Sequence, residues 1–399
     1  MTAAAFEFAT AGRIVFGAGR ARELPEVLAG LGSRVLVCTG ADPDRHAGLL
    51  GGLGLPAAVF PVAGEPTVDV ARAATERARE HGADVVAAIG GGSVIDTGKA
   101  VAVLLGNGGD PLDYLEVVGA GRKITRPARP CVAVPTTAGT GAEVTANAVL
   151  AAPGRRLKAS LRSPLMIPRV ALVDPGLTVS CPRPVTAASG LDALTQCLEP
   201  LVSVKATPLT DGLAAEGLRR AAAGLRAAYA DGGDLRARSD MAACSLLGGM
   251  ALANAKLGAV HGLAGVIGGI ADVPHGLACA ALLVPVIEAN VAALRAGPAA
   301  APGQPVGQGQ PGHPGHRALD RYARAAGLLT GRPDASVEDG ITWIRETLAR
   351  LEVPGLGAFG VRSDQADAIV AQAARSSSMQ GNPVPLSTGA LRAALLAAI

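Results

Sequence analysis

Two histidines stand in a strongly apolar stretch of the chain, GAVHGLAGVIGGIADVPHG (258–276). These are His261 and His275, two of only six histidines in 399 residues. Upstream, the segment LDALTQ places Asp192 and Gln196 four residues apart, on one face of a helix. A carboxylate with two imidazoles suits Fe(II) or Zn(II) and leaves positions open for a substrate. Because the three pieces are far apart in the sequence, a metal site requires the fold to bring them together.

A single histidine in an apolar helix is more often a buried residue with one satisfied hydrogen bond than a metal ligand. Two of them, together with a carboxylate in one helical region, favour a metal site. His313 and His316 are a different case, because they lie in or beside a Gly/Pro/Gln-rich stretch. We interpret them as solvated loop residues.

The segment GGGSVID directly follows an apolar run and opens a helical pattern. Gly90, Gly91 and Gly92 allow the backbone to turn sharply and approach a ligand without a Cβ in the way. Ser93 and Asp96, three residues apart, suggest an N-cap pair. The free N–H groups and the dipole of such a helix start attract phosphate, although glycine-rich turns also occur for packing alone.

A second loop, PTTAGTGAEVT (135–145), also follows an apolar run. Thr136, Thr137 and Thr140 supply hydroxyl groups between small residues, which suits a loop that lies along a nucleotide. The alternative is an ordinary threonine-rich turn, but two such loops in one sheet favour nucleotide binding. Neither loop fits G-x-G-x-x-G, so the standard dinucleotide fingerprint is absent.

The first 175 residues alternate between short apolar runs and helical patterns. We expect buried strands at 34–40, 83–93, 129–137 and 170–175. A helical pattern at 67–82 lies between the first two. Strand, helix and strand in this order predict a doubly wound parallel sheet.

From about residue 182 onward the chain is rich in Ala and Leu, and three long segments between 184 and 258 have helical spacing. We therefore expect an α/β domain at 1–177 and an all-helical domain at 178–399. The segment 297–315 is so rich in Gly, Pro and Gln that we expect a flexible insertion between helices.

Composition excludes several classes of protein. The formal charge is +3, with 36 basic and 33 acidic residues, too even a balance for nucleic-acid or membrane-surface binding. We find no run of 18 apolar residues that stands out as a membrane span and no signal peptide at the start. Six cysteines are scattered without a C-x-x-C pair, as in reduced, mostly buried thiols. We expect a cytoplasmic protein.

The motifs GGGSVIDTGKA, PTTAGTGAEVT and LDALTQCLEP, in this order, resemble those of the iron-containing (group III) alcohol dehydrogenases. The resemblance covers nearly the whole chain, including RIVFGAG, LMIPRVALVDP and GNPVPLS. It implies a Rossmann-like α/β NAD(P)-binding domain, a helical domain and a cleft between them. It further implies that the GGGS turn binds the cofactor pyrophosphate, that the threonine-rich loop contacts the nucleotide, and that one Asp and three His bind the metal. The matching positions are Asp192, 196, His261 and His275.

The chain departs from the family pattern at two positions. Gln196 stands where the family has a histidine ligand, and an amide oxygen is a neutral, weak ligand. Gly265 stands where the family commonly has a second histidine near the nicotinamide, so a proton relay through that position is lost. Related maleylacetate reductases lack a metal. The retained Asp192, His261 and His275 still predict Fe(II) or Zn(II), with optional help from Gln196.

The cofactor preference depends on the end of the first predicted strand. NAD-preferring relatives tend to have an acidic residue there, whereas this chain has Gly40 with Arg45 nearby. We therefore expect NADPH over NADH. The resemblance also places Asn147 and Lys158 toward the cleft. Lys158 is either a contact for an acidic substrate group or a surface charge.

These observations predict an alcohol dehydrogenase or aldehyde reductase that transfers a hydride with help from a metal acting as a Lewis acid. We expect a small alcohol or aldehyde substrate and a homodimer, as in relatives. Three alternatives stay open: a metal-independent keto-acid reductase, a sugar-phosphate cyclase resembling dehydroquinate synthase, and a non-catalytic homologue. The absence of a basic cluster for a substrate phosphate counts against the cyclase.

Overall fold

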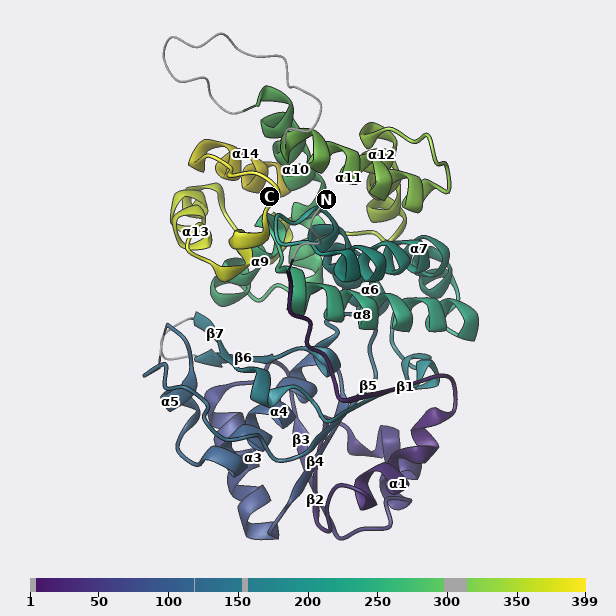
Figure 1. Ribbon diagram of the computed structural model, residues 1–399, viewed down its shortest axis with the longest axis vertical. Helices are drawn as coiled ribbons and strands as arrows, with labels where there is room; N and C mark the ends of the chain where they lie inside the picture. Colours follow the sequence, from purple (N-terminus) through teal and green to yellow (C-terminus); the bar gives the residue numbers. More distant parts are fainter. Residues whose placement is uncertain (1–4, 118, 153–156, 298–313) are drawn as a thin grey trace.

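The computed structural model describes residues 5–117, 119–152, 157–297 and 314–399. In Figure 1 an α/β half, coloured purple to blue, lies below a helical half, coloured teal to yellow. The α/β half is built on a six-stranded sheet in the order β1-β8-β5-β4-β2-β3, with every pairing parallel. The strands are β1 (Arg13–Phe16), β2 (Val35–Gly40), β3 (Ala57–Val62), β4 (Val85–Gly90), β5 (Cys131–Pro135) and β8 (Val170–Val173). The predicted fold class is confirmed.

The four predicted strands are β2, β4, β5 and β8, and the two that the sequence did not reveal are the edge strands. All of β4 and β5 is buried, as expected for parallel strands covered on both faces. By contrast, β1 has four residues of which one is buried, and β3 alternates and contains Pro61, which an edge strand tolerates. Short, half-exposed strands carry too weak an apolar signal to be recognised.

Helices cover both faces of this sheet. The predicted helix at 67–82 is α3 (Val68–His81), which Thr67 caps by accepting from the Val70 N–H and which ends at Gly82 with φ 69°. The remaining helices of this half are α1 (Leu24–Ala29), α2 (Ala47–Gly51), α4 (Gly92–Asn107) and α5 (Pro111–Tyr114). An antiparallel hairpin of β6 (Asn147–Ala152) and β7 (Leu157–Arg162), which we did not predict, packs on α4 and contacts the helical half through β7.

The three helices predicted between 184 and 258 are α6 (Arg183–Val202), α7 (Pro208–Ala230) and α8 (Leu235–Ala255), and they pack against one another. Small residues allow the close approach: a Cβ at Gly217 of α7 would lie 2.3 Å from the Cys197 sulfur on α6. The other helices are α9 (Ala259–Ile270), α10 (His275–Ala296), α11 (Pro314–Thr330), α12 (Val337–Arg350), α13 (Ala366–Ala373) and α14 (Thr388–Ala398).

The expectation that no stretch of the chain stands out as a membrane span needs correction. Helix α10 has the length and hydropathy of a membrane span, with a mean hydropathy of 2.1, and α8 with α9 would qualify as one bent span. Most of α10 is buried inside the protein, and its first residue is His275, so its apolar character serves the core.

The predicted insertion at 297–315 lies almost entirely outside the described residues, as does His313.

A buried lysine ties the two glycine- and threonine-rich segments together. Lys99 of α4 is fully buried, and its ammonium group donates to the Ala142 carbonyl at 2.9 Å and the Thr145 hydroxyl at 3.0 Å. It also lies 3.0 Å from the Asp96 carboxylate, which accepts from the Val149 N–H. Asp96 therefore does not form the predicted cap pair with Ser93, and α4 begins at Gly92 without a side-chain cap.

Replacement of this lysine by an apolar chain of similar length tests the connection. Lys99→Met leaves the largely buried Asp96 carboxylate, 14% exposed, without its cation, so the free energy of unfolding should fall by about 3 kcal/mol. Chemical unfolding followed by circular dichroism measures the change, with Lys123→Met, at an exposed position, as the matched control. A Lys99→Met protein as stable as the wild type would show that the buried ion pair does not hold the two segments.

Candidate metal centre

Three elements of the helical half bring the predicted ligands together. Asp192 lies in the middle of α6 and is 2% exposed, and His261 lies in the first turn of α9 and is 7% exposed. His275 is the first residue of α10, directly after the N-cap Pro274, and its side chain is 37% exposed. The cluster is thus buried on the Asp192 side and open on the His275 side.

The distances within this cluster are those of groups that share one ion. Asp192 Oδ1 lies 3.3 Å from His261 Nε2 and 3.8 Å from His275 Nε2, and the two imidazole rings are 5.5 Å apart between centroids. A fourth group, the Cys279 sulfur, lies 3.7 Å from His275 Nε2. One ligand atom from each of the four residues lies within 4.8 Å of all the others.

Sequence reasoning missed a second carboxylate, Glu199, which contacts the ring nitrogen of His261 that faces away from Asp192. Its Oε2 lies 2.6 Å from His261 Nδ1, and its Oε1 accepts from the Val260 N–H at 2.8 Å. Glu199 follows Asp192 by seven residues on α6, hence on the same helix face. That spacing, LDALTQCLE, was a signal that a second carboxylate shares the site.

The Glu199 contact fixes which nitrogen of His261 faces the cluster. When Nδ1 carries the proton that Glu199 accepts, Nε2 presents a lone pair to the Asp192 carboxylate. Two acceptors at 3.3 Å repel each other unless a cation lies between them or the ring takes a second proton. The donor set therefore fits a divalent cation at this point.

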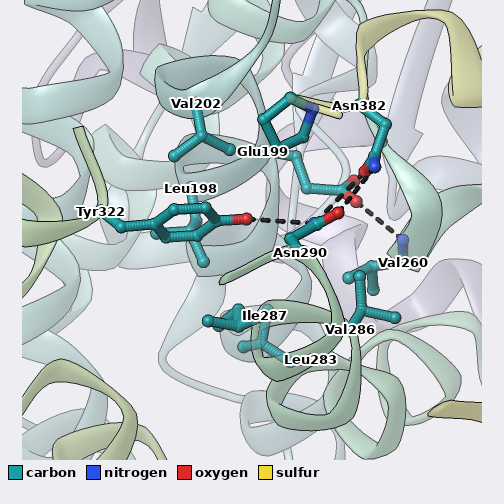
Figure 2. Close-up of a pocket in the computed structure, with 12 residues that line it drawn as sticks. Leu198, Glu199, Val202, Val260, Leu283, Val286, Ile287, Asn290, Tyr322 and Asn382 are labelled. Atoms are coloured by element: carbon teal, nitrogen blue, oxygen red, sulfur yellow. Dashed lines mark hydrogen bonds between the residues drawn. The ribbon is translucent and has the colours of Figure 1, made fainter. Parts of the chain in front are cut away.

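Figure 2 shows the buried surroundings of Glu199, whose carboxylate also contacts Nδ1 of His261. Asn382 accepts from the Ala259 N–H at the start of α9 and donates to Asn290, and Asn290 donates to the Tyr322 hydroxyl. These bonds link α9 to α10, α11 and the C-terminal segment. The motif GNPVPLS, which contains Asn382, thereby positions the helix that carries His261.

Gln196, one turn after Asp192, is 3% exposed, and its Oε1 has no hydrogen-bond partner among the described residues. A buried polar oxygen without a partner is costly. A cation, or a polar substrate group, next to Asp192 would satisfy it. The predicted optional role of Gln196 fits this observation.

The electrostatics of the cluster show an excess of negative groups. Burial raises the pKa of Asp192, but His261, His275 and Gln196 lower it by more, so the pKa lies below its usual range. The charge of Cys279 raises the pKa of His275 to about 9, with burial opposing. Burial lowers the pKa of His261, yet Cys279, Asp192 and Glu199 raise it well above its usual value. The site attracts positive charge, which protons or a metal ion can supply.

The two predicted cofactor loops lie against each other at the carboxyl ends of β4 and β5. A Cβ at Gly91 would stand 3.3 Å from Thr137 Oγ1, and one at Gly92 would stand 2.8 Å from Thr140. The Thr136 N–H donates to the Gly90 carbonyl at 3.0 Å. The chain order reverses between β2 and β4, and ligands of open α/β sheets bind at such a switch point.

The remaining predicted residues are more dispersed. Gly40 ends β2 beside the switch point, and Ser93 lies in the first turn of α4. Asn147 opens β6 opposite Arg162 in the hairpin. Lys158 of β7 pairs with Glu65 at 3.2 Å, and a Cβ at Gly268 of α9 would stand 3.4 Å from its ammonium group. Within the described chain no hydrogen bond or ion pair joins Lys158 to the Asp192 cluster.

The contact between Glu199 and His261 leads to a prediction. Glu199→Gln removes the charge that holds the Nδ1 proton, so the affinity for Zn(II) should fall by about 10- to 100-fold. Competition with a chromophoric chelator measures the affinity. Glu346→Gln, at an exposed position of α12 in the same half, should leave it unchanged. An unchanged affinity in Glu199→Gln would show that Glu199 does not contribute to metal binding.

Two family models match this chain. Residues 11–175 match the family described as iron-containing alcohol dehydrogenase, and residues 186–399 match the C-terminal family of Fe-containing alcohol dehydrogenases. A choline dehydrogenase of Bacillus subtilis (strain 168) is 32% identical over 382 residues, which is 93% of this chain and 89% of that protein.

Solved structures extend the similarity to the fold. A crystal structure of 1,3-propanediol oxidoreductase superposes with a TM-score of 0.87 at 30% identity and covers 99% of this chain and 100% of that one. A sulfoacetaldehyde reductase from Bifidobacterium kashiwanohense, in complex with NAD+, gives a TM-score of 0.83 at 27% identity, with 99% of each chain covered. This protein belongs to the iron-containing alcohol dehydrogenase family.

Proposed function

We propose that this alcohol oxidoreductase transfers a hydride between NAD(P) and a small alcohol or aldehyde, with a divalent cation held by Asp192, His261 and His275. The observation that carries the proposal is the convergence of these three side chains from α6, α9 and α10, with their ligand atoms within 4.8 Å. Buried ionisable side chains brought together from distant parts of a chain, with shifted pKa values, are typical of functional sites.

A bound Fe(II) or Zn(II) would supply Lewis-acid polarisation of the substrate oxygen. The chain's own residues prepare the site for it. Asp192 contributes negative charge from a buried position, and Glu199 holds the His261 ring so that Nε2 faces inward. His275, partly exposed, marks the side from which a substrate approaches.

Gly265 adds space next to this site. It lies one turn after His261 on α9, and a Cβ there would meet no atom within 4 Å. A side chain at this position would reduce the room for a substrate or for the nicotinamide ring. The space that the family histidine would fill is therefore open in this protein. A proton relay must use other groups.

The cofactor proposal depends on the N-terminus of α4. Its N-cap is Gly91, and no side chain caps the first N–H groups. These groups and the helix dipole suit the pyrophosphate, with Gly90, Gly91, Gly92 and Ser93 lining one side. Thr136, Thr137 and Thr140 line the other side with hydroxyl groups. Lys99 and Asp96 hold the two sides together.

We favour NADPH over NADH because of the residues after β2. Position 40 is a glycine with no atom within 4 Å of a would-be Cβ, so no side chain at that position, acidic or otherwise, obstructs a 2′-phosphate. Arg45 follows in the short helix Pro43–His46.

One alternative function has an observation in its favour. Gln196 in place of a third histidine weakens the metal site, as expected of a metal-independent keto-acid reductase. Such an enzyme needs a cation for the substrate carboxylate, and Lys158 is one candidate, with a surface charge as the other interpretation of this residue. In the structure Lys158 pairs with Glu65 at 3.2 Å, so its charge already has a partner. The metal-dependent function therefore has the stronger support.

Removal of the metal separates these two functions. Aldehydes and keto acids are screened with NADPH and NADH before and after dialysis against a chelator. Loss of the Lewis acid removes several kcal/mol of stabilisation, so kcat should fall by at least about 100-fold and return with Fe(II) or Zn(II). Cofactor binding, followed by nicotinamide fluorescence, should persist. Full activity on a keto acid in the chelator would favour the alternative.

The NADPH preference is tested by Arg45→Ala. If Arg45 contacts the 2′-phosphate, the substitution removes a charged hydrogen bond and KM for NADPH should rise by about 10- to 100-fold. KM for NADH should stay the same. Arg22→Ala, at an exposed position of the same half, serves as the control. An equal rise for both cofactors would contradict a contact with the 2′-phosphate.

A further inference from the structure

The cluster around Asp192 contains a group that the family comparison does not assign. Cys279 is fully buried and lies four residues after His275 on α10, so both side chains project from the same face one turn apart. Its sulfur lies 3.7 Å from His275 Nε2 and within 4.8 Å of the ligand atoms of Asp192 and His261. None of the other five cysteines belongs to such a cluster within the described chain.

The separations in the cluster are close to those of a tetrahedral site. With metal–sulfur bonds of about 2.3 Å and metal–nitrogen or metal–oxygen bonds of about 2.0–2.1 Å, neighbouring ligand atoms lie about 3.3–3.6 Å apart. The pairs Asp192–His261, His275–Cys279 and His275–Asp192 measure 3.3, 3.7 and 3.8 Å. Small rotations of the partly exposed His275 ring would bring the longer pairs into this range.

We propose that Cys279 Sγ is the fourth protein ligand of the cation, in place of the histidine that Gln196 has replaced. This inference rests on the proposed function, because it presupposes a cation at Asp192, His261 and His275. A thiolate is a strong, charged ligand, whereas the Gln196 amide oxygen is neutral and weak. Gln196 Oε1 then stays available to accept a hydrogen bond from a substrate hydroxyl group.

A thiolate ligand changes the chemistry of the site in two ways. Asp192 and Cys279 together supply two negative charges, which neutralise a divalent cation in its buried position. Soft sulfur also favours Zn(II) and Co(II) over harder ions such as Mn(II) and Mg(II). We therefore expect the protein to bind Zn(II) or Co(II) more tightly than Mn(II). The ratio of these affinities should decrease when Cys279 is replaced by a residue without sulfur.

X-ray absorption at the zinc edge of the wild-type protein, loaded with one equivalent of Zn(II), tests the proposal without a variant. The account requires one sulfur scatterer at about 2.3 Å and nitrogen or oxygen scatterers at about 2.0–2.1 Å. Zinc bound with only nitrogen and oxygen neighbours would overturn the Cys279 proposal and leave the proposed function intact. A wild-type protein that binds no Zn(II), Fe(II) or Co(II) would overturn both.

Cobalt spectroscopy assigns the sulfur to a residue. Co(II)-loaded wild type should show a thiolate-to-cobalt charge-transfer band in the near ultraviolet, and Cys279→Ser should lose it. Zn(II) affinity should fall by at least about 100-fold in Cys279→Ser. Cys244→Ser, which removes a buried thiol on α8, should keep both the band and the affinity. A band that survives in Cys279→Ser would overturn the proposal.

Discussion

The buried carboxylate of Asp192 is the constraint on which the helical half depends. A charge in this position is tolerated only if partners compensate it. α6 places it, α9 and α10 bring His261 and His275 to it, and the Asn382–Asn290–Tyr322 network holds those helices in register. Since Glu199 directs a lone pair of His261 at Asp192, the arrangement requires positive charge at its centre.

The α/β half is subject to a different constraint, because its backbone must be able to approach an anionic ligand closely. β4 and β5 end side by side, and the turns that follow them touch through Gly91, Gly92, Thr137 and Thr140. Lys99 joins these turns from beneath, with its charge matched by Asp96. The N-terminal segment also crosses between the halves, because Ala9 exchanges two hydrogen bonds with Asn254 of α8 (Figure 1).

Sequence reasoning succeeded where periodicity is strong or motifs are long. It found the four buried strands, α3 and the three helices α6 to α8, and it named Asp192, His261 and His275. It missed β1, β3 and the β6–β7 hairpin, whose short strands are half exposed. It paired Asp96 with Ser93, whereas Asp96 pairs with Lys99. Glu199 was overlooked although its spacing from Asp192 places both on one helix face, and Cys279 because its proximity to Asp192 and His261 depends on contacts between helices.

The central claim is that one divalent cation lies between Asp192, His261 and His275. Crystals of the protein grown with Zn(II) and measured on both sides of the zinc absorption edge test it most directly. The account predicts one anomalous-difference peak within about 2.0–2.3 Å of Asp192 Oδ1, His261 Nε2 and His275 Nε2. Peaks confined to surface residues, with Asp192 bonded only to protonated imidazoles, would contradict it.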